Sequence, residues 1–110
     1  MREIKLKRDL LNNVRAGIKT ATTRKGIKDF SVGPARLVDH ADPANFVDVT
    51  IHRINLHTWG YIQEHDTLYH YEGYSNPKEL NDALLDIYGE MDDDQDMTVI
   101  FFGKEVENGN

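Results

Sequence analysis

Residues 46–56 read FVDVTIHRINL, and this stretch carries the clearest fold signal in the chain. Its apolar positions from Val47 to Ile51 alternate with polar ones, which is the period-two pattern of a strand with one buried face. The alternation continues at Ile54 and Leu56 in the opposite phase. A change of phase inside one strand predicts a β-bulge near His52-Arg53, the device by which small barrels bend their strands.

Shorter periodic segments on both sides of this strand predict further elements. Ile4 and Leu6 alternate with charged residues, and apolar residues recur at helical spacing over residues 10–18. Asp9 is placed to cap that helix and Gly17 to end it. In chain order we expect strands at residues 4–6, 35–40, 46–56 and 97–103, an extended segment at 19–24, one or two short helices between 59 and 72, and a longer helix at 77–88. Helices interspersed with several bent strands predict an α+β domain built on a small, strongly curved β-sheet or barrel.

The longer helix has the best-defined start and end. Asn76 is a capping residue, Pro77 occupies the first helical position, and Glu79 stands three residues after the cap. Gly89 is placed to end the helix. The helical spacing predicts a buried stripe formed by Leu80, Leu84, Ile87 and Tyr88.

The composition fits one compact domain spanning residues 1–110. The chain has no cysteine, 39% hydrophobic residues and 29% charged residues, which excludes a disulfide framework, a thiolate zinc site and a thiol nucleophile. Its apolar runs, such as Val99–Phe102, are far shorter than the ~20 residues of a membrane span, and residues 1–4 open no signal-peptide pattern. We therefore expect a soluble, cytoplasmic protein without a membrane partner.

The net charge of −6 hides an asymmetry along the chain. Residues 1–38 hold ten Lys or Arg against three Asp or Glu, whereas residues 39–110 hold three against sixteen. If the first segment forms one surface, that surface attracts a phosphate while the rest of the molecule repels long polyanions. This favours a small or locally presented anion as the ligand. The alternative is that the opposite charges pair across the fold.

Residues 17–24 read GIKTATTR and hold the densest set of chemically active side chains. In an extended segment, Thr20, Thr22 and Arg24 project to one side because side chains alternate. Lys19 reaches the same side on its long stem. The segment therefore predicts a polar pocket wall that carries an amine, hydroxyl groups and a guanidinium group.

Two kinds of site suit this wall. In a binding site, Arg24 and Lys19 hold a phosphate or the polar edge of a base, and the threonines add neutral hydrogen bonds. In a catalytic site, a neutral Lys19 activates the Thr22 hydroxyl as a nucleophile, and a carboxylic acid protonates the leaving amine. Glu72, set among aromatic residues beside a glycine, is the candidate acid. A third interpretation leaves Lys19 and Arg24 solvated and the threonines as ordinary strand residues.

The order of these landmarks resembles the ASCH domain family. The landmarks are a helix with a Leu-Leu pair, the pattern G-x-K-T-x-T-x-R, a bent strand, a Glu-Gly-aromatic turn, a capped helix that ends in Tyr-Gly, and a last T-V-I-x-F strand. They cover the chain from about Leu10 to Phe102. The resemblance implies a PUA-like small curved β-barrel with flanking helices.

The resemblance also implies an activity and its residues. Small stand-alone ASCH proteins include the bacterial N4-acetylcytidine amidohydrolases, which use a lysine base, a threonine nucleophile and a glutamate acid. At the matching positions these are Lys19, Thr22 and Glu72, and no metal or organic cofactor is implied. Other relatives are described as RNA-binding modules and some as ribonucleases.

Aromatic, histidine and acidic residues outside this motif offer weaker signals. Trp59, Tyr71 and Tyr74 suit either the stacking of a pyrimidine or ordinary packing. The histidines at 52 and 57, and those at 65 and 70, are spaced by five, which predicts no shared face and no metal site. The acidic run at residues 92–96 lacks the glycine and distal glutamate of an EF-hand and is interpreted as a solvated loop.

The sequence thus supports a nucleoside or single-stranded RNA as the partner. The leading hypothesis is deacetylation of N4-acetylcytidine by Lys19, Thr22 and Glu72, with substrate contacts from Thr20, Arg24 and Tyr74. The alternatives are a non-catalytic RNA-binding or ribonuclease-type module and an interaction domain with an idle pocket.

Overall fold

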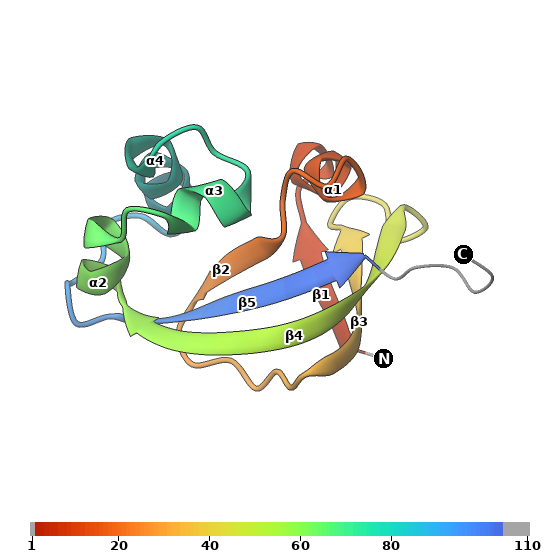
Figure 1. Cartoon of the computed structure of the whole chain (residues 1–110), viewed down its shortest axis with the longest axis horizontal. Coiled ribbons are helices and arrows are strands. Elements are labelled where there is room, and N and C mark those ends of the chain that lie inside the picture. Colours follow the sequence, from red (N-terminus) through yellow and green to blue (C-terminus); the bar gives the residue numbers. More distant parts are fainter. Residues whose placement is uncertain (1, 105–110) are drawn as a thin grey trace.

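Over residues 2–104, the part of the chain that the computed structural model describes, five strands form one curled sheet flanked by four helices (Figure 1). The strands are β1 (Arg2–Leu6), β2 (Ala21–Lys25), β3 (Gly33–Asp39), β4 (Phe46–Thr58) and β5 (Asp96–Lys104), and the helices are α1 (Arg8–Arg15), α2 (Trp59–Glu64), α3 (Leu68–Glu72) and α4 (Pro77–Tyr88). The strand order is β1-β3-β4-β5-β2, with β1 parallel to β3 and every other pair antiparallel. The predicted α+β class with a curved sheet is confirmed, in the form of a curled half-barrel.

The bend of β4 explains the curl. Its pairing with β5 passes from Ile51 opposite Phe102 to Arg53 opposite Phe101, so one extra residue stands on β4. This is the bulge that the phase change predicts, and β4 arcs across the length of the molecule in Figure 1. The curl brings the two edge strands, β1 and β2, close together. A hydrogen bond of 2.6 Å from the Arg24 guanidinium on β2 to the Lys5 carbonyl on β1 joins them.

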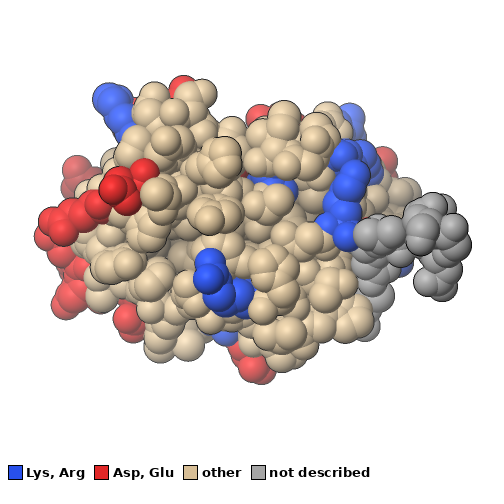
Figure 2. Space-filling view, in the orientation of Figure 1, with Lys and Arg blue, Asp and Glu red and all other residues tan. Residues whose placement is uncertain are grey.

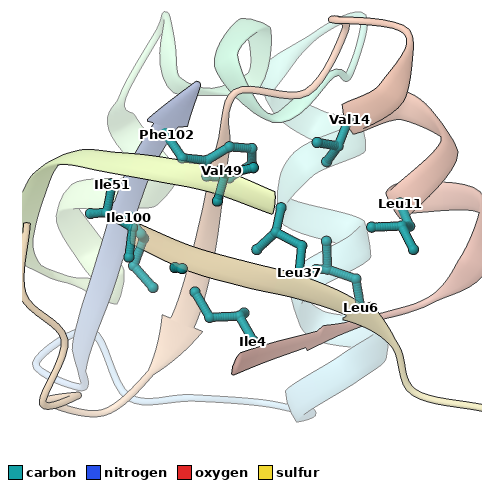
Figure 3. Close-up of a cluster of buried hydrophobic side chains, with 10 residues drawn as sticks. Ile4, Leu6, Leu11, Val14, Leu37, Val49, Ile51, Ile100 and Phe102 are labelled. Carbon is teal, nitrogen blue, oxygen red and sulfur yellow. The ribbon is translucent and has the colours of Figure 1, made fainter. Parts of the chain in front are cut away.

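Strand β5 separates two hydrophobic clusters. Ile100 and Phe102 face the first cluster, under α1, whereas Val99 and Phe101 face the second, under α2, α3 and α4. Because both faces of β5 are buried, its sequence is nearly continuously apolar instead of alternating. Figure 3 shows side chains of the first cluster converging from β1, α1, β3, β4 and β5. Trp59 belongs to the second cluster and is 1% exposed, so it packs in the core and is not available for stacking.

Helix α4 begins and ends as predicted, but its buried face is narrower. The Asn76 side chain accepts a hydrogen bond of 3.0 Å from the Glu79 N–H, and the helix ends before Gly89. Leu80 and Leu84 are buried. The prediction that Ile87 is buried is wrong: its side chain is 48% exposed, because the last turn of α4 reaches the rim of a cavity.

Helix α1 ends as predicted but begins differently. Gly17 has a φ of 76°, the left-handed conformation that stops a helix, and its N–H donates to the Val14 carbonyl. The prediction that Asp9 caps the helix is wrong. Strand β1 passes directly into α1, so that the residue before the first turn is Lys7, whose side chain makes no capping hydrogen bond. No helix among residues 2–104 is both long and apolar enough to cross a membrane.

Candidate functional site

The end of α3 places Glu72 against the segment that precedes β2. Thr20 donates its N–H to the Tyr71 carbonyl over 2.6 Å, which joins the two segments. Gly73, with a φ of 87°, ends α3 in the left-handed conformation. A Cβ at this glycine would lie 3.2 Å from Ile18 Cγ2, closer than an ordinary contact, so both the backbone conformation and the packing favour glycine here. The turn therefore fixes Glu72 beside Lys19.

Lys19 and Glu72 form a buried ion pair. Lys19 Nζ lies 3.1 Å from Glu72 Oε1, and the two residues are 2% and 3% exposed. The Thr23 hydroxyl donates a hydrogen bond of 2.5 Å to the other carboxylate oxygen, Oε2. Removing two charged groups from water costs several kcal/mol per ion, and their mutual attraction returns about the same free energy. The buried pair is therefore weak evidence that Lys19 and Glu72 stabilise the fold.

A cavity of about 200 Å³ opens beside this pair, at the seam between the two edge strands. One side of its wall comes from the end of β1 and the start of α1, and the opposite side comes from α4. Its polar lining comprises Lys5, Lys7, Lys19, Thr22, Thr23, Arg24, His40, Glu72 and Tyr74, and its apolar lining comprises Leu6, Leu10, Leu80, Leu84, Ile87 and Tyr88.

The two adjacent threonines of β2 have different environments. Thr23 is bound to Glu72, whereas the Thr22 hydroxyl makes no hydrogen bond to any residue in the described range 2–104. Thr22 is 4% exposed and lines the cavity. A hydroxyl group without a protein partner is available to a ligand, while that of Thr23 holds the carboxylate in place.

Thr20 does not share the cavity with Thr22 and Arg24. Its side chain lies near the Tyr71 carbonyl, at 3.4 Å, and lines a neighbouring hollow. The expected alternation begins only at Ala21, where β2 starts to pair with β5, so Thr20 is outside the regular strand. Tyr74 lines both the cavity and this hollow, which makes it the wall between them.

Tyr74 keeps its proton at any physiological pH. Burial, followed by the nearby charges of Glu72, Asp9 and Glu79, raises the pKa of this phenol to about 12. The hydroxyl group therefore remains a neutral donor and acceptor beside the ion pair. Tyr71, by contrast, is 42% exposed and contacts the Phe101 ring edge-on on another surface.

Arg24 contributes positive charge to the cavity lining. One of its terminal nitrogens donates to the Lys5 carbonyl, whereas its Nε is buried without a hydrogen-bond partner. The described residues contain no group of three or more His, Asp or Glu arranged to hold a metal ion. The chemistry of this site is thus that of an amine, a carboxyl group, two hydroxyl groups and a guanidinium group.

Thr23, which holds Glu72, is a site residue that the sequence reasoning did not select, and Lys5, Lys7 and His40 of the cavity lining are others. The position of Thr23 next to Thr22 puts it on the opposite side of a regular strand, and residue types alone assign it no role. Its contact with Glu72 depends on where α3 ends, which no pattern within residues 17–24 encodes.

Comparison with solved structures assigns the fold to a known type. The structure of hypothetical protein PH0355 matches with a TM-score of 0.72 at 14% identity, covering 96% of this chain and 100% of that chain. An ASCH domain from Lactobacillus crispatus JV V101 matches with a TM-score of 0.69 at 11% identity, covering 94% of this chain and 79% of that one. Protein EF3133 from Enterococcus faecalis V583, described under the family model DUF984, matches with a TM-score of 0.64 at 12% identity, covering 88% and 67%. No family model matches the chain, and no curated protein does.

The chain therefore has the ASCH, PUA-like fold that the landmark order predicts. At 11 to 14% identity, these likenesses establish the architecture alone.

Proposed function

We propose that this chain is a small amidohydrolase that removes the acetyl group from N4-acetylcytidine. The observation that carries the proposal is the buried contact between Lys19 and Glu72 on the wall of a cavity that also presents the unpartnered hydroxyl group of Thr22. A candidate base, acid and nucleophile thus line one cavity, and these are the three kinds of group that nucleophilic amide hydrolysis uses.

The ion pair supplies both the base and the acid. A proton shift along the 3.1 Å contact converts the ammonium and carboxylate groups into a neutral amine and a neutral carboxylic acid. The Lys19 amine then takes the proton of the Thr22 hydroxyl while Oγ1 bonds to the acetyl carbon. The bond between this carbon and N4 breaks, and Glu72 gives its proton to the departing amine.

Water completes the cycle. After the first half-reaction, the acetyl group is an ester on Thr22, Lys19 is an ammonium and Glu72 is a carboxylate. Glu72 takes a proton from water as the water oxygen attacks the ester, and Lys19 returns its proton to the Thr22 oxygen. Acetic acid leaves, Lys19 and Glu72 are again neutral, and a proton that passes back from Glu72 to Lys19 restores the ion pair.

The remaining polar groups hold the substrate. The Arg24 guanidinium lines the cavity and supplies positive charge for the oxyanion that develops on the acetyl carbonyl. The Tyr74 hydroxyl stands beside Glu72 and suits an edge of the base. Thr20 lines the neighbouring hollow, so it can contact the substrate only where the substrate extends past Tyr74 into that hollow.

The decisive experiment measures release of cytidine from N4-acetylcytidine by the unmodified chain and by Thr22→Val and Thr23→Val. We expect turnover in the unmodified chain, a loss of about a thousandfold or more in Thr22→Val because the nucleophile is gone, and a loss of about 10- to 100-fold in Thr23→Val because Glu72 is less well placed. The matched substitutions differ only in which hydroxyl group they remove.

Two results would contradict the proposal. One is no turnover by the folded, unmodified chain. The other is full turnover by Thr22→Val, which would remove the nucleophile assignment. Lys19→Arg tests the base separately, since it keeps the positive charge but cannot give up its proton, and we expect no turnover from it.

A second candidate function, a non-catalytic RNA-binding module, is supported by another hollow, which is lined by residues of β4, β5, α3 and the segment before α3. There the Arg53 guanidinium lies 4.1 Å from the centre of the Phe101 ring, and Tyr71 contacts the same ring at 5.6 Å. Tyr71 is 42% exposed, and an exposed aromatic ring near a cation is typical of single-strand stacking sites, whereas Phe101 is 6% exposed and packs beneath the Arg53 guanidinium. Binding of single-stranded RNA that weakens with salt and is lost in Arg53→Gln, without turnover of N4-acetylcytidine, would favour this function.

A further inference from the structure

The cations around the cavity are not balanced by acidic side chains. Within residues 2–104, Lys5, Lys7 and Arg24 line the cavity and have no carboxylate within ion-pair distance. The remaining charges of the lining, those of Lys19 and Glu72, cancel each other. The cavity thus carries three uncompensated positive charges in a chain whose net charge is −6.

These cations are held together by the fold. Lys5 and Lys7 stand two residues apart at the end of β1, and the hydrogen bond from Arg24 to the Lys5 carbonyl fixes the guanidinium group on the same seam. Lys5 and Lys7 are exposed and Arg24 is half-buried; like charges this close in the fold repel one another, and a bound anion relieves that repulsion. Arg24 also keeps a buried donor, its Nε, without a protein partner.

Nearby acidic side chains do not balance the charges of Lys5, Lys7 and Arg24. Asp9 and Glu79 are close enough to raise the pKa of Tyr74, but neither lines the cavity. Asp39 is engaged by Arg8 at 2.7 Å and lies 3.7 Å from His40, the fourth basic residue of the lining.

The opposite wall of the cavity is apolar. Leu80, Leu84 and Ile87 of α4 face the basic seam across a space of about 200 Å³. A ligand that fits all three surfaces has an anionic end, a flat or apolar body and a polar group that reaches Lys19 and Glu72.

We propose that the basic seam formed by Lys5, Lys7 and Arg24 is a phosphate subsite, so that the cavity prefers a cytidine monophosphate over the free nucleoside. This rests on the proposed function, since it takes the cavity to be a cytidine site. The phosphate lies at the seam, the base lies along α4, and the substituent at N4 reaches the buried pair.

The charge distribution favours a mononucleotide over a long strand. Figure 2 shows acidic side chains gathered at the end of the molecule that carries α2 and the segment before β5, while Lys and Arg atoms are visible in the hollow between α1 and the α3–α4 region. A long RNA would run from the basic seam onto the acidic surface and be repelled there, whereas a single phosphate does not leave the seam.

The test compares binding of cytidine, its 5′- and 3′-monophosphates and a 5′-phosphorylated single-stranded oligonucleotide to the unmodified chain by titration calorimetry. These are products or inert ligands, so the result does not depend on turnover. We expect one of the monophosphates to bind on the order of 10-fold or more tightly than cytidine at low salt, with the advantage shrinking as salt is added. Equal affinity for nucleoside and monophosphates would overturn the subsite, and an oligonucleotide that binds far more tightly than either monophosphate would overturn the mononucleotide preference.

Matched lysine substitutions locate the subsite. Lys5→Gln/Lys7→Gln removes two charges of the seam, and Lys25→Gln/Lys28→Gln removes two exposed charges that do not line the cavity. We expect the first pair to abolish the preference for the monophosphate while the affinity for cytidine stays the same, and the second pair to leave the preference unchanged. A preference that survives in the first pair would overturn the assignment. If the chain prefers the monophosphate but does not hydrolyse N4-acetylcytidine, the subsite stands and the proposed activity fails.

Discussion

Glu72 and Asp39 are both buried carboxylates paired with a basic residue from a distant segment, but their surroundings differ. Asp39 is bound by the Arg8 guanidinium at 2.7 Å, and its other donors are the Ala41 N–H at 2.9 Å and the Asn45 amide at 3.2 Å. Glu72 is bound by the Lys19 ammonium and the Thr23 hydroxyl. The donors of Asp39 hold its pKa down to about 2, the Arg8 hydrogen bond making the largest contribution.

The donors of the two carboxylates differ in whether they can release a proton. A guanidinium group, a backbone amide and a side-chain amide do not release protons near neutral pH, so the Asp39 cluster is fixed in one protonation state. An ammonium group can release a proton and a carboxylate can receive it, so the Glu72 cluster has a second state available. The fold therefore uses Asp39 to hold residues 39–45 and leaves Glu72 beside a cavity.

The largest effect on stability is expected from Lys19→Met. It leaves the Glu72 carboxylate buried without a counter-charge, which costs about 3–5 kcal/mol of unfolding free energy. The double variant Lys19→Met/Glu72→Met removes both charges and should recover to within about 1 kcal/mol of the unmodified chain. Urea unfolding at neutral pH measures both values, and a double variant as unstable as the single one would show that the pair stabilises the fold.

The second effect concerns the response of Asp39 to acid. Because its pKa in the folded chain is about 2, below the ordinary value of 3.8, the ionised group stabilises the fold above about pH 4, and this contribution is lost as the pH falls from 4 to 2. Asp39→Asn should lower the melting temperature at pH 7 and flatten its pH dependence between 4 and 2. The control is Asp48→Asn, which removes a half-buried partner of Arg36 and should have a smaller effect. Identical pH profiles for Asp39→Asn and the unmodified chain would contradict the structural role.

The parts of the fold that the sequence predicts correctly are encoded locally. The cap at Asn76 and the stop at Gly89 are set by neighbouring residues, and the bulge before Arg53 is visible as a phase change within one strand. The apolar run of β5 likewise reflects burial of both of its faces. Each of these signals spans at most a dozen residues.

The contacts that sequence reasoning misses all join distant segments. The exposure of Ile87 depends on the cavity that the last turn of α4 borders, and the direction of Thr20 depends on its bond to the Tyr71 carbonyl. The Thr23 contact joins residues 49 positions apart. The roles of Lys19, Thr22 and Glu72 remain predictions, because the structure places these groups but does not show them react.

The smallest effect tests how tightly the turn after α3 fixes Glu72. Gly73 and Gly17 both have left-handed backbone conformations, with φ of 87° and 76°, so an alanine at either position strains the backbone by about 1–2 kcal/mol. Only at Gly73 does the new Cβ also meet a neighbour, Ile18 Cγ2 at 3.2 Å, whereas nothing lies within 4 Å at Gly17. Gly73→Ala should therefore push the end of α3 away from Lys19 and lower turnover of N4-acetylcytidine by about tenfold. Gly17→Ala should lower the unfolding free energy about as much as Gly73→Ala does, but leave turnover unchanged. Unfolding curves and kcat measured on both variants separate strain from positioning. Equal losses of turnover would mean that the position of Glu72 does not depend on the contact between Gly73 and Ile18.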